Sequence, residues 1–211
     1  NKIKNFPKKY INKINVIPAL LRKKFYEVEK AKSINGQINL LVIGGSQGAK
    51  IFDKLIKNSI IELSKKYSLK IYQQTNLDNF ENLENFYKAN NINYRLFNFD
   101  EDISNLMSKA NIGLTRAGAS TLAELVFLNL PCVAIPLPTS KDNHQYENAL
   151  FYNKIGCNWI LNQSEINGET ISNKLVNIID NQDEYLLKKI NMKNFSYQNT
   201  WNNINQKIIS V

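Results

Sequence analysis

The stretch that decides the fold runs from Asn39 to Ala49 and reads N-L-L-V-I-G-G-S-Q-G-A. Asn39–Ile43 has the length and apolar character of a buried strand, and it runs directly into a glycine-rich turn. We expect a helix from Ala49 to about Lys66 after this turn. Glycines allow close backbone approach to a ligand, and a helix N-terminus suits phosphate. The turn matches neither the dinucleotide pattern G-x-G-x-x-G nor a Walker A loop, and on its own it is also compatible with a plain tight connection.

Similar units of strand and helix follow along the chain. Strands are predicted at 69–74, 92–97, 111–115, 131–135 and 157–161. Helices are predicted at 79–89, from an N-cap at 102 to 109, at 120–127 and at 143–154, with two or three more between 164 and 208. This alternation predicts an α/β fold, a Rossmann-like parallel sheet with helices on both faces. Ligands of such sheets bind beyond the carboxyl ends of the strands, which is where each unusual loop of this chain lies.

Composition excludes several classes of protein. The 211 residues include one His and two Cys, too few for a structural zinc site, and we expect Cys132 and Cys157 to be buried thiols. No apolar run approaches the roughly 20 residues of a membrane-spanning helix. The net charge is +9. This charge fits either an anionic partner or the Lys, Asn and Ile excess of an A- and T-rich genome, and no nucleic-acid-binding signature accompanies it.

The second unusual loop is Thr115–Glu124, T-R-A-G-A-S-T-L-A-E. Small residues again open a helix after a strand, so Ser120 and Thr121 are candidates to bind an anion. Glu124 lies one turn beyond Ser120 on the same helix face, where a carboxylate can bind vicinal hydroxyls such as those of ribose. The alternative is structural: Ser120 caps the helix and the helix dipole favours Glu124.

The third loop is 135–149 and follows the most apolar of the predicted strands. It carries a polar cluster, Asp142, Asn143, His144 and Gln145, at the start of a helix. Side chains with both donors and acceptors suit neutral sugar hydroxyls. A lone His is more often structural or solvent-exposed than catalytic, so no catalytic base is assigned to His144.

Together the three motifs G-G-S-Q-G-A, T-R-A-G-A-S-T-L-A-E-L and P-L-P-T-S-K-D-N-H-Q-Y-E-N-A resemble one family in both wording and order. The chain from about Asn15 onward resembles the C-terminal, donor-binding domain of the undecaprenyldiphospho-muramoylpentapeptide beta-N-acetylglucosaminyltransferases, the MurG members of glycosyltransferase family 28. The resemblance implies half of a GT-B enzyme. This half binds UDP-N-acetylglucosamine, and the preceding half binds the lipid-linked muramoylpentapeptide acceptor. The implied reaction is an inverting transfer that converts lipid I to lipid II in peptidoglycan synthesis, with no metal and no cofactor.

The resemblance also implies roles for individual residues. Ser46 and Gln47 contact the donor, Ala119, Ser120 and Thr121 hold its diphosphate, and Glu124 binds the ribose hydroxyls. His144 and Gln145 contact the hydroxyls of the N-acetylglucosamine, and Asp100 lies with Phe99 where backbone groups recognise uracil. Arg22 ends the segment V-I-P-A-L-L-R, which departs from the family's G-N-P-V-R. The catalytic residue is unknown and is expected in the preceding domain.

These implications divide the chain into three parts. Residues 1–36 are predicted to be a linker and the remnant of an N-terminal acceptor domain, 37–194 the UDP-sugar-binding domain, and 195–211 a C-terminal helix that packs toward the acceptor domain. Because the sequence starts at Asn1, we expect a fragment that binds donor without catalysing transfer alone. The expected location is peripheral, on the cytoplasmic face of the bacterial membrane, with no nucleic-acid partner. Two alternatives remain open: another GT-B UDP-sugar lipid glycosyltransferase, and a nucleotide-binding subunit of a split glycosyltransferase.

Overall fold

The structure, a computed structural model, describes residues 7–14, 17, 19–197 and 199–209. The side chains of residues 45–49 lie outside this description. The strands are β1 (Ile38–Ile43), β2 (Leu69–Gln74), β3 (Asn93–Phe97), β4 (Ile112–Thr115), β5 (Cys132–Ala134) and β6 (Asn158–Ile160). The helices are α1 (Lys24–Glu27), α2 (Gly45–Ser64), α3 (Phe80–Ala89), α4 (Ile103–Lys109), α5 (Ala119–Phe127), α6 (His144–Lys154), α7 (Gly168–Asp180), α8 (Gln182–Ser196) and α9 (Trp201–Ile209). Short 3-10 turns are η1 (Lys8–Lys13), η2 (Leu77–Asn79), η3 (Lys141–Asn143) and η4 (Gln163–Glu165).

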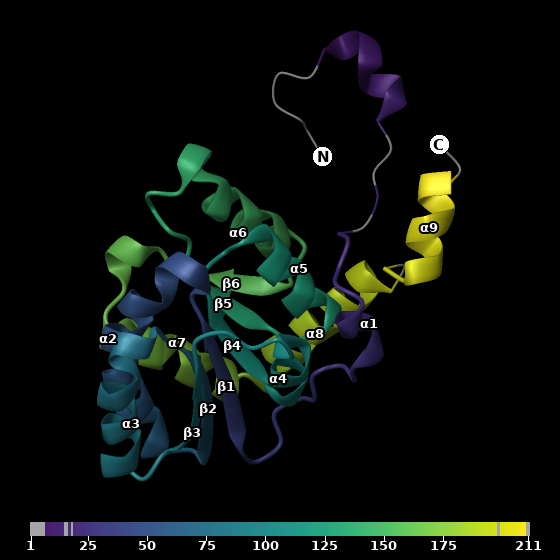
Figure 1. The fold of residues 1–211 in the computed structure, drawn as a ribbon. Helices are drawn as coiled ribbons and strands as arrows, with labels where there is room; N and C mark the ends of the chain where they lie inside the picture. Colours follow the sequence, from purple (N-terminus) through teal and green to yellow (C-terminus); the bar gives the residue numbers. More distant parts are fainter. Residues whose placement is uncertain (1–6, 15–16, 18, 198, 210–211) are drawn as a thin grey trace.

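Within the described residues, the strands form one six-stranded sheet in the order β3-β2-β1-β4-β5-β6, and every pairing is parallel. The predicted Rossmann-like α/β fold is therefore confirmed. The strand order reverses between β1 and β4, because the chain builds outward from β1 in one direction and then from β4 in the other (Figure 1). A crevice opens at such a reversal, and ligands of this fold bind there.

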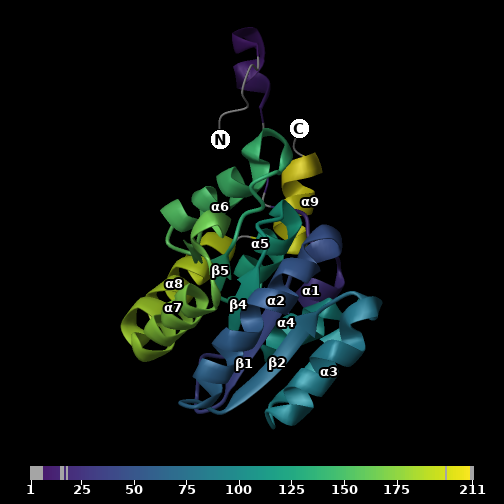
Figure 2. The same cartoon turned by 90° about the vertical axis from the view of Figure 1, so that its left-hand side faces the viewer.

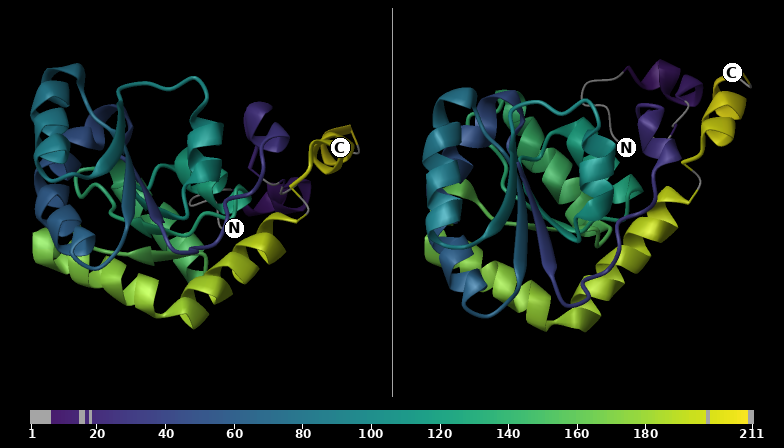
Figure 3. Two further views of the ribbon diagram at one scale, coloured as in Figure 1. Left: turned by 90° about the horizontal axis from the view of Figure 1, so that it is seen from below. Right: turned by 60° about the horizontal axis from the view of Figure 1, so that its bottom comes forward.

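Two hydrophobic clusters cover the two faces of the sheet. Leu40 and Val42 of β1 join the cluster under α2, α3 and α7, whereas Leu41 and Ile43 join the cluster under α4, α5 and α6. The alternation follows from the period of two along a strand. Because both faces are buried, the central strands read as continuous apolar runs rather than as alternating ones. Figure 2 shows the helices on both sides of the sheet, and Figure 3 shows α7 and α8 following one another along the outside of the molecule.

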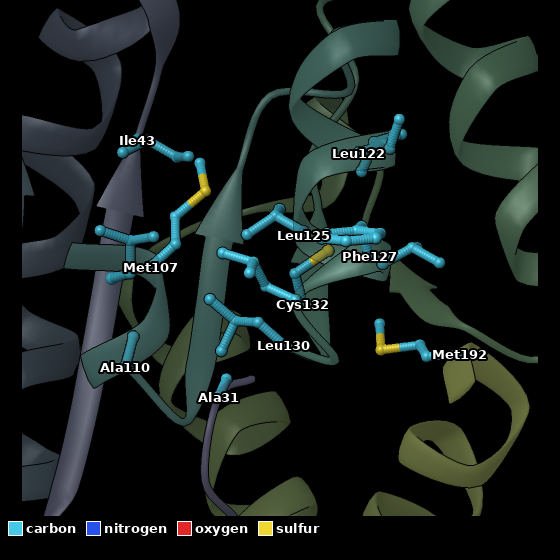
Figure 4. Packing of buried hydrophobic residues seen from close by; sticks show 14 of the residues in the cluster. Ala31, Ile43, Met107, Ala110, Leu122, Leu125, Phe127, Leu130, Cys132 and Met192 are labelled. Atoms are coloured by element: carbon cyan, nitrogen blue, oxygen red, sulfur yellow. The ribbon is translucent and has the colours of Figure 1, made fainter. Parts of the chain in front are cut away.

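The segment before the sheet takes part in the core. Leu21, Phe25 and Ala31 are buried in the cluster under α4, α5 and α6. Figure 4 shows Ala31 beside Leu130 and near Cys132 in this cluster. By contrast, no residue of η1 is buried, and η1 lies away from the sheet (Figure 1). The predicted boundaries at residues 36 and 194 remain a prediction, to which the structure adds that residues 21–31 pack on the domain.

Two expected helix starts are wrong. Helix α2 begins at Gly45, not at Ala49, so the glycine-rich turn is itself the first turn of the helix. Helix α5 begins at Ala119 with Gly118 as its N-cap, and no side chain makes a capping hydrogen bond. The capping alternative for Ser120 is therefore wrong, because Ser120 lies inside the helix. Cys132 and Cys157 are buried free thiols, as expected.

Among the described helices, none is long and apolar enough to cross a membrane. The described residues also contain no group of three or more His, Cys, Asp or Glu side chains that could hold a metal ion.

Candidate functional site

Two helix N-termini meet at the point where the strand order reverses. One residue separates β1 from the start of α2, and three residues separate β4, the neighbouring strand, from the start of α5. The first N–H groups of a helix have no acceptor within the helix, and neither helix has a side-chain cap. The combined positive dipole ends therefore form a surface suited to an anion such as a diphosphate.

The residues predicted to hold the diphosphate lie at these two starts. Ala119, Ser120 and Thr121 are the first three residues of α5, with Ala119 and Ser120 exposed and Thr121 half-buried. Their N–H groups precede the first hydrogen bond of this helix, from Leu122 N–H to the Gly118 carbonyl at 2.9 Å. Ser46 and Gln47 lie in the first turn of α2, and their side chains lie outside the described part of the chain.

Glu124 and Arg22, 102 residues apart, are brought together. Arg22 Nη2 donates to Glu124 Oε1 at 3.1 Å. Glu124 is 8% exposed, whereas the Arg22 side chain is 55% exposed. Burial raises the pKa of the Glu124 carboxyl, and Arg22 opposes that shift through its charge and hydrogen bond. The segment that ends at Arg22 is the one that differs from the family pattern. Two of its residues, Val16 and Pro18, lie outside the described residues.

The loop after β5 presents His144 and Gln145 at the start of α6. His144 is exposed, and its Nδ1 lies 2.8 Å from the Lys141 carbonyl oxygen. Because a carbonyl only accepts, Nδ1 carries the proton and Nε2 is left to accept from a ligand when the ring is neutral. Gln145 Oε1 accepts from the Leu137 N–H at 3.0 Å, which fixes the amide and leaves its NH₂ group as the donor end.

This loop is held in an unusual backbone conformation. Asp142 and Asn143 both have positive φ, 52° and 55°, directly before α6. Such left-handed conformations are uncommon outside glycine, and they cluster at ligand-binding sites. Here they turn the chain so that His144 and Gln145 start the helix at the carboxyl edge of the sheet.

Asp100 lies apart from these groups, in the loop after β3. Its carboxylate accepts from Arg95 Nη2 at 2.7 Å and from the Asp102 N–H at 2.8 Å. The side chain is thus engaged within its own loop, and the neighbouring Phe99 is 75% exposed. The structure therefore does not support recognition of uracil by the Asp100 carboxylate. It fits recognition of uracil by backbone groups of this loop.

Two residues inside the quoted motifs were missed by the sequence analysis. Arg116 is 6% exposed, and its Nη1 donates to the carbonyls of Ile135 at 3.0 Å and Pro136 at 3.4 Å. Its Nε is buried without an acceptor, and it makes no ion pair among the described residues. Asn148 Nδ2 donates to the Ala117 carbonyl at 3.1 Å. Arg116 thus ties the loop after β4 to the loop after β5, and Asn148 ties the loop after β4 to α6. The available signal was the position of both residues within motifs whose other polar residues are predicted to bind ligand.

Comparison with known proteins identifies the family. Residues 39–204 match the model of the glycosyltransferase family 28 C-terminal domain. The chain belongs to glycosyltransferase family 28. The matched range includes the turns at the starts of α2 and α5, the loop after β3 and the loop before α6. It therefore contains all the predicted site residues except Arg22.

Within family 28, one relative is the UDP-N-acetylglucosamine–N-acetylmuramyl-(pentapeptide) pyrophosphoryl-undecaprenol N-acetylglucosamine transferase of Pelagibacter ubique. It is 64% identical over 211 residues, which cover 100% of this chain and 59% of the relative. The protein of the same name from Rickettsia bellii is 36% identical over 84% of this chain and 52% of its own length. The crystal structure of Acinetobacter baumannii MurG matches with a TM-score of 0.66 and 28% identity, over 75% of this chain and 47% of that one. The chain thus spans between half and three fifths of the length of these curated relatives.

Proposed function

We propose that this chain is the donor-binding part of an inverting glycosyltransferase that moves N-acetylglucosamine from UDP-N-acetylglucosamine to the undecaprenyl-diphospho-muramoylpentapeptide lipid. One observation carries the proposal: two uncapped helix N-termini meet at the strand-order reversal, with the buried carboxylate of Glu124 one turn inside α5. The printed names of the relatives describe this donor and this lipid-linked acceptor.

The geometry supports a division of roles along the donor. The N–H groups of residues 119–121 and the start of α2 stabilise the diphosphate, on which negative charge grows as UDP leaves. Glu124 accepts hydrogen bonds from the two ribose hydroxyls. Gln145 donates through its NH₂ group, and His144 accepts through Nε2, so together they fit a sugar with several hydroxyls.

Removal of the acceptor proton belongs to another part of the protein. Among the described residues at this edge, His144 is exposed and Glu124 is paired with Arg22, so neither is placed as a base. We propose that the acceptor and its base belong to a preceding domain, in line with the greater length of the relatives. The lipid-linked acceptor also supports a peripheral location on the cytoplasmic face of the membrane, to which the net charge of +9 can contribute.

Calorimetric titration of the 211-residue chain with UDP-N-acetylglucosamine, UDP-glucose and UDP, without metal, tests the donor role. We expect UDP-N-acetylglucosamine to bind best. The Glu124→Gln variant should lose about 1–3 kcal/mol of binding free energy, as for a hydrogen bond to a charged group. The exposed residue Glu165, in η4, offers a matched control, and Glu165→Gln should bind like the wild type.

The competing functions predict different results. Equal affinity for UDP-glucose would favour another UDP-sugar lipid glycosyltransferase. Unchanged affinity in Glu124→Gln would contradict the ribose role of this carboxylate. If folded protein bound no uridine nucleotide, the donor-binding proposal for this chain would be wrong.

A further inference from the structure

A cavity of about 980 Å³ lies at the amino ends of β1 and β2, at the opposite edge of the sheet from the donor site. Its walls are the segment 28–37, the end of α4 and the first residues of the two strands, and we call it the amino-edge cavity. In Figure 1 the segment between α1 and β1 runs past α4 to the lower end of β1.

The floor of the amino-edge cavity is polar where the rest of this sheet face is apolar. Asn39 and Lys70 are partners in the register of β1 and β2, so they lie side by side. Both share a strand face with buried neighbours two residues on, Asn39 with Leu41 and Lys70 with Tyr72. Lys70 Nζ lies 5.4 Å from the centre of the Tyr72 ring, which also lines the cavity.

Three lysines from three different elements line the cavity: Lys32 from the segment before β1, Lys70 from β2 and Lys109 from the end of α4. Glu29 is the one acidic residue among the lining residues. In the described part of the chain none of these four side chains makes an ion pair. The cavity therefore has an excess of positive charge among its lining residues, and it favours an anion.

Asn39 gives a second, independent observation that points to a ligand in this cavity. Its Oδ1 is buried without a hydrogen-bond donor. Its backbone groups are satisfied by Asn111, since Asn39 N–H donates to Asn111 Oδ1 and Asn111 N–H donates to the Asn39 carbonyl, each at 3.0 Å. A buried acceptor without a donor costs free energy, and a turn of the Asn39 side chain toward the cavity that it lines would let a ligand hydroxyl remove that cost.

We propose that the amino-edge cavity is a second binding site, for a phosphorylated polyol. The lysines bind the phosphate group, and Asn39 Oδ1 accepts a hydrogen bond from a hydroxyl. The other lining residues, which include Ser33, Asn35 and Ser108, can bind further hydroxyls because their side chains both donate and accept. Free glycerol phosphate and the headgroup of phosphatidylglycerol share this chemistry.

Titration calorimetry with glycerol 1-phosphate and with inorganic phosphate tests the site on the 211-residue chain. Glycerol 1-phosphate should bind with one-to-one stoichiometry and about fivefold more tightly than phosphate, because its glycerol hydroxyls can reach Asn39 while its phosphate group stays at the lysines. Lys70→Gln should weaken binding at least about tenfold, the loss expected for a hydrogen bond to a charged group. Lys66→Gln, at an exposed lysine outside the cavity, is the matched control and should bind normally.

A second variant tests the role of Asn39. Asn39→Leu should bind phosphate and glycerol 1-phosphate equally, and its circular dichroism and urea-unfolding curve report whether it still folds. If Asn39→Leu does not fold, the tenfold difference between Lys70→Gln and Lys66→Gln still decides the question.

Sedimentation with vesicles distinguishes the two sources of the ligand. If Lys70 is needed for binding to phosphatidylglycerol vesicles, and phosphatidylcholine vesicles bind nothing, the ligand is the lipid headgroup. If only soluble glycerol 1-phosphate binds, the ligand is a free metabolite. Failure of both ligands to bind, or equal binding by Lys70→Gln and Lys66→Gln, overturns the proposal. Binding of UDP-N-acetylglucosamine is measured on the same samples, so the two proposals fail separately.

Discussion

At the scale of single residues, Arg116 is a buried charge that makes no ion pair within the described part of the chain. Its guanidinium lies 5.3 Å from the centre of the Phe52 ring of α2, and burial lowers its pKa from the ordinary value. Arginine nevertheless stays protonated in proteins. A positive charge held in a low-dielectric region beside the two helix starts strengthens the field at the proposed diphosphate site.

We therefore predict that Arg116→Met weakens binding of UDP about 10- to 100-fold, as for loss of one favourable charge interaction. Uridine carries no phosphate, so its affinity should change little. Titration of both ligands into the wild type and the variant makes the comparison. An equal loss for UDP and uridine would show that Arg116 acts by supporting the loops rather than by its charge.

The raised pKa of Glu124 predicts a pH dependence of stability. The folded pKa of Glu124 lies above the ordinary carboxyl value of 4.5, so folding disfavours the carboxylate form. The contribution of Glu124 to stability is fully present below pH 4.5 and is lost as pH rises through the folded pKa. Urea unfolding from pH 4 to pH 7 should therefore show Glu124→Gln gaining stability relative to the wild type as pH rises.

Arg22 affects the pH at which the Glu124 carboxyl titrates, and therefore the pH range over which its contribution to stability is lost. Its charge and hydrogen bond lower the Glu124 pKa, so Arg22→Gln should move the Glu124 titration to higher pH. Carboxyl NMR titration measures this directly. The same titration curve in wild type and Arg22→Gln would mean that the ion pair does not persist in solution, as is common for pairs with one exposed partner.

At the scale of elements, α8 departs from the usual amphipathic pattern. It buries Lys188 and Lys189 and exposes Leu186, Leu187 and Ile190. The burial of Lys189 has a local reason, because its Nζ donates to the carbonyls of Ala31 and Asn129, each at 2.8 Å. Lys189 thereby joins the segment before β1 to the turn between α5 and β5.

We predict that Lys189→Met lowers the free energy of unfolding by about 1–3 kcal/mol, because two buried carbonyls lose their donor. Lys193→Met, at an exposed lysine of the same helix, should stay within about 0.5 kcal/mol of the wild type. Urea unfolding gives both values. Faster hydrogen exchange around Ala31 in Lys189→Met alone would identify the lost connection, and equal stability of the two variants would contradict this role.

At the scale of the whole molecule, the sheet separates two edges that carry different chemistry. Asn39 and Ile43 lie four residues apart on β1, about 13 Å at 3.3 Å per residue. The amino-edge cavity includes none of the residues proposed to bind the donor among its described lining residues. Changes at sites this far apart with no shared partners are normally additive.

The double variant Glu124→Gln/Lys70→Gln should therefore bind UDP-N-acetylglucosamine as Glu124→Gln does, within about 0.5 kcal/mol. Calorimetry on the wild type, the two single variants and the double variant completes a double-mutant cycle, which gives the coupling energy between the two edges. A larger coupling energy would show that the sheet transmits a change from one edge to the other.

Much of this molecule follows from sequence alone. The order of strands and helices, the parallel sheet and the three ligand-edge loops follow from local hydrophobic periodicity and from glycine-rich turns, which act within a few residues. The start of α2 was misplaced by four residues, because glycine lowers helix propensity while the tertiary structure nevertheless continues the helix through the turn.

Tertiary structure alone decided the contacts between distant segments. The Arg22–Glu124 pair, the buried Arg116 guanidinium, the Lys189 hydrogen bonds and the unsatisfied Asn39 Oδ1 depend on packing between elements far apart in the chain. Periodicity reports which residues share a face of one element, but it does not say what another element places against that face. The sequence by itself determined the fold and the family-type motifs, whereas the three-dimensional arrangement determined which polar groups are paired and which are left for a ligand.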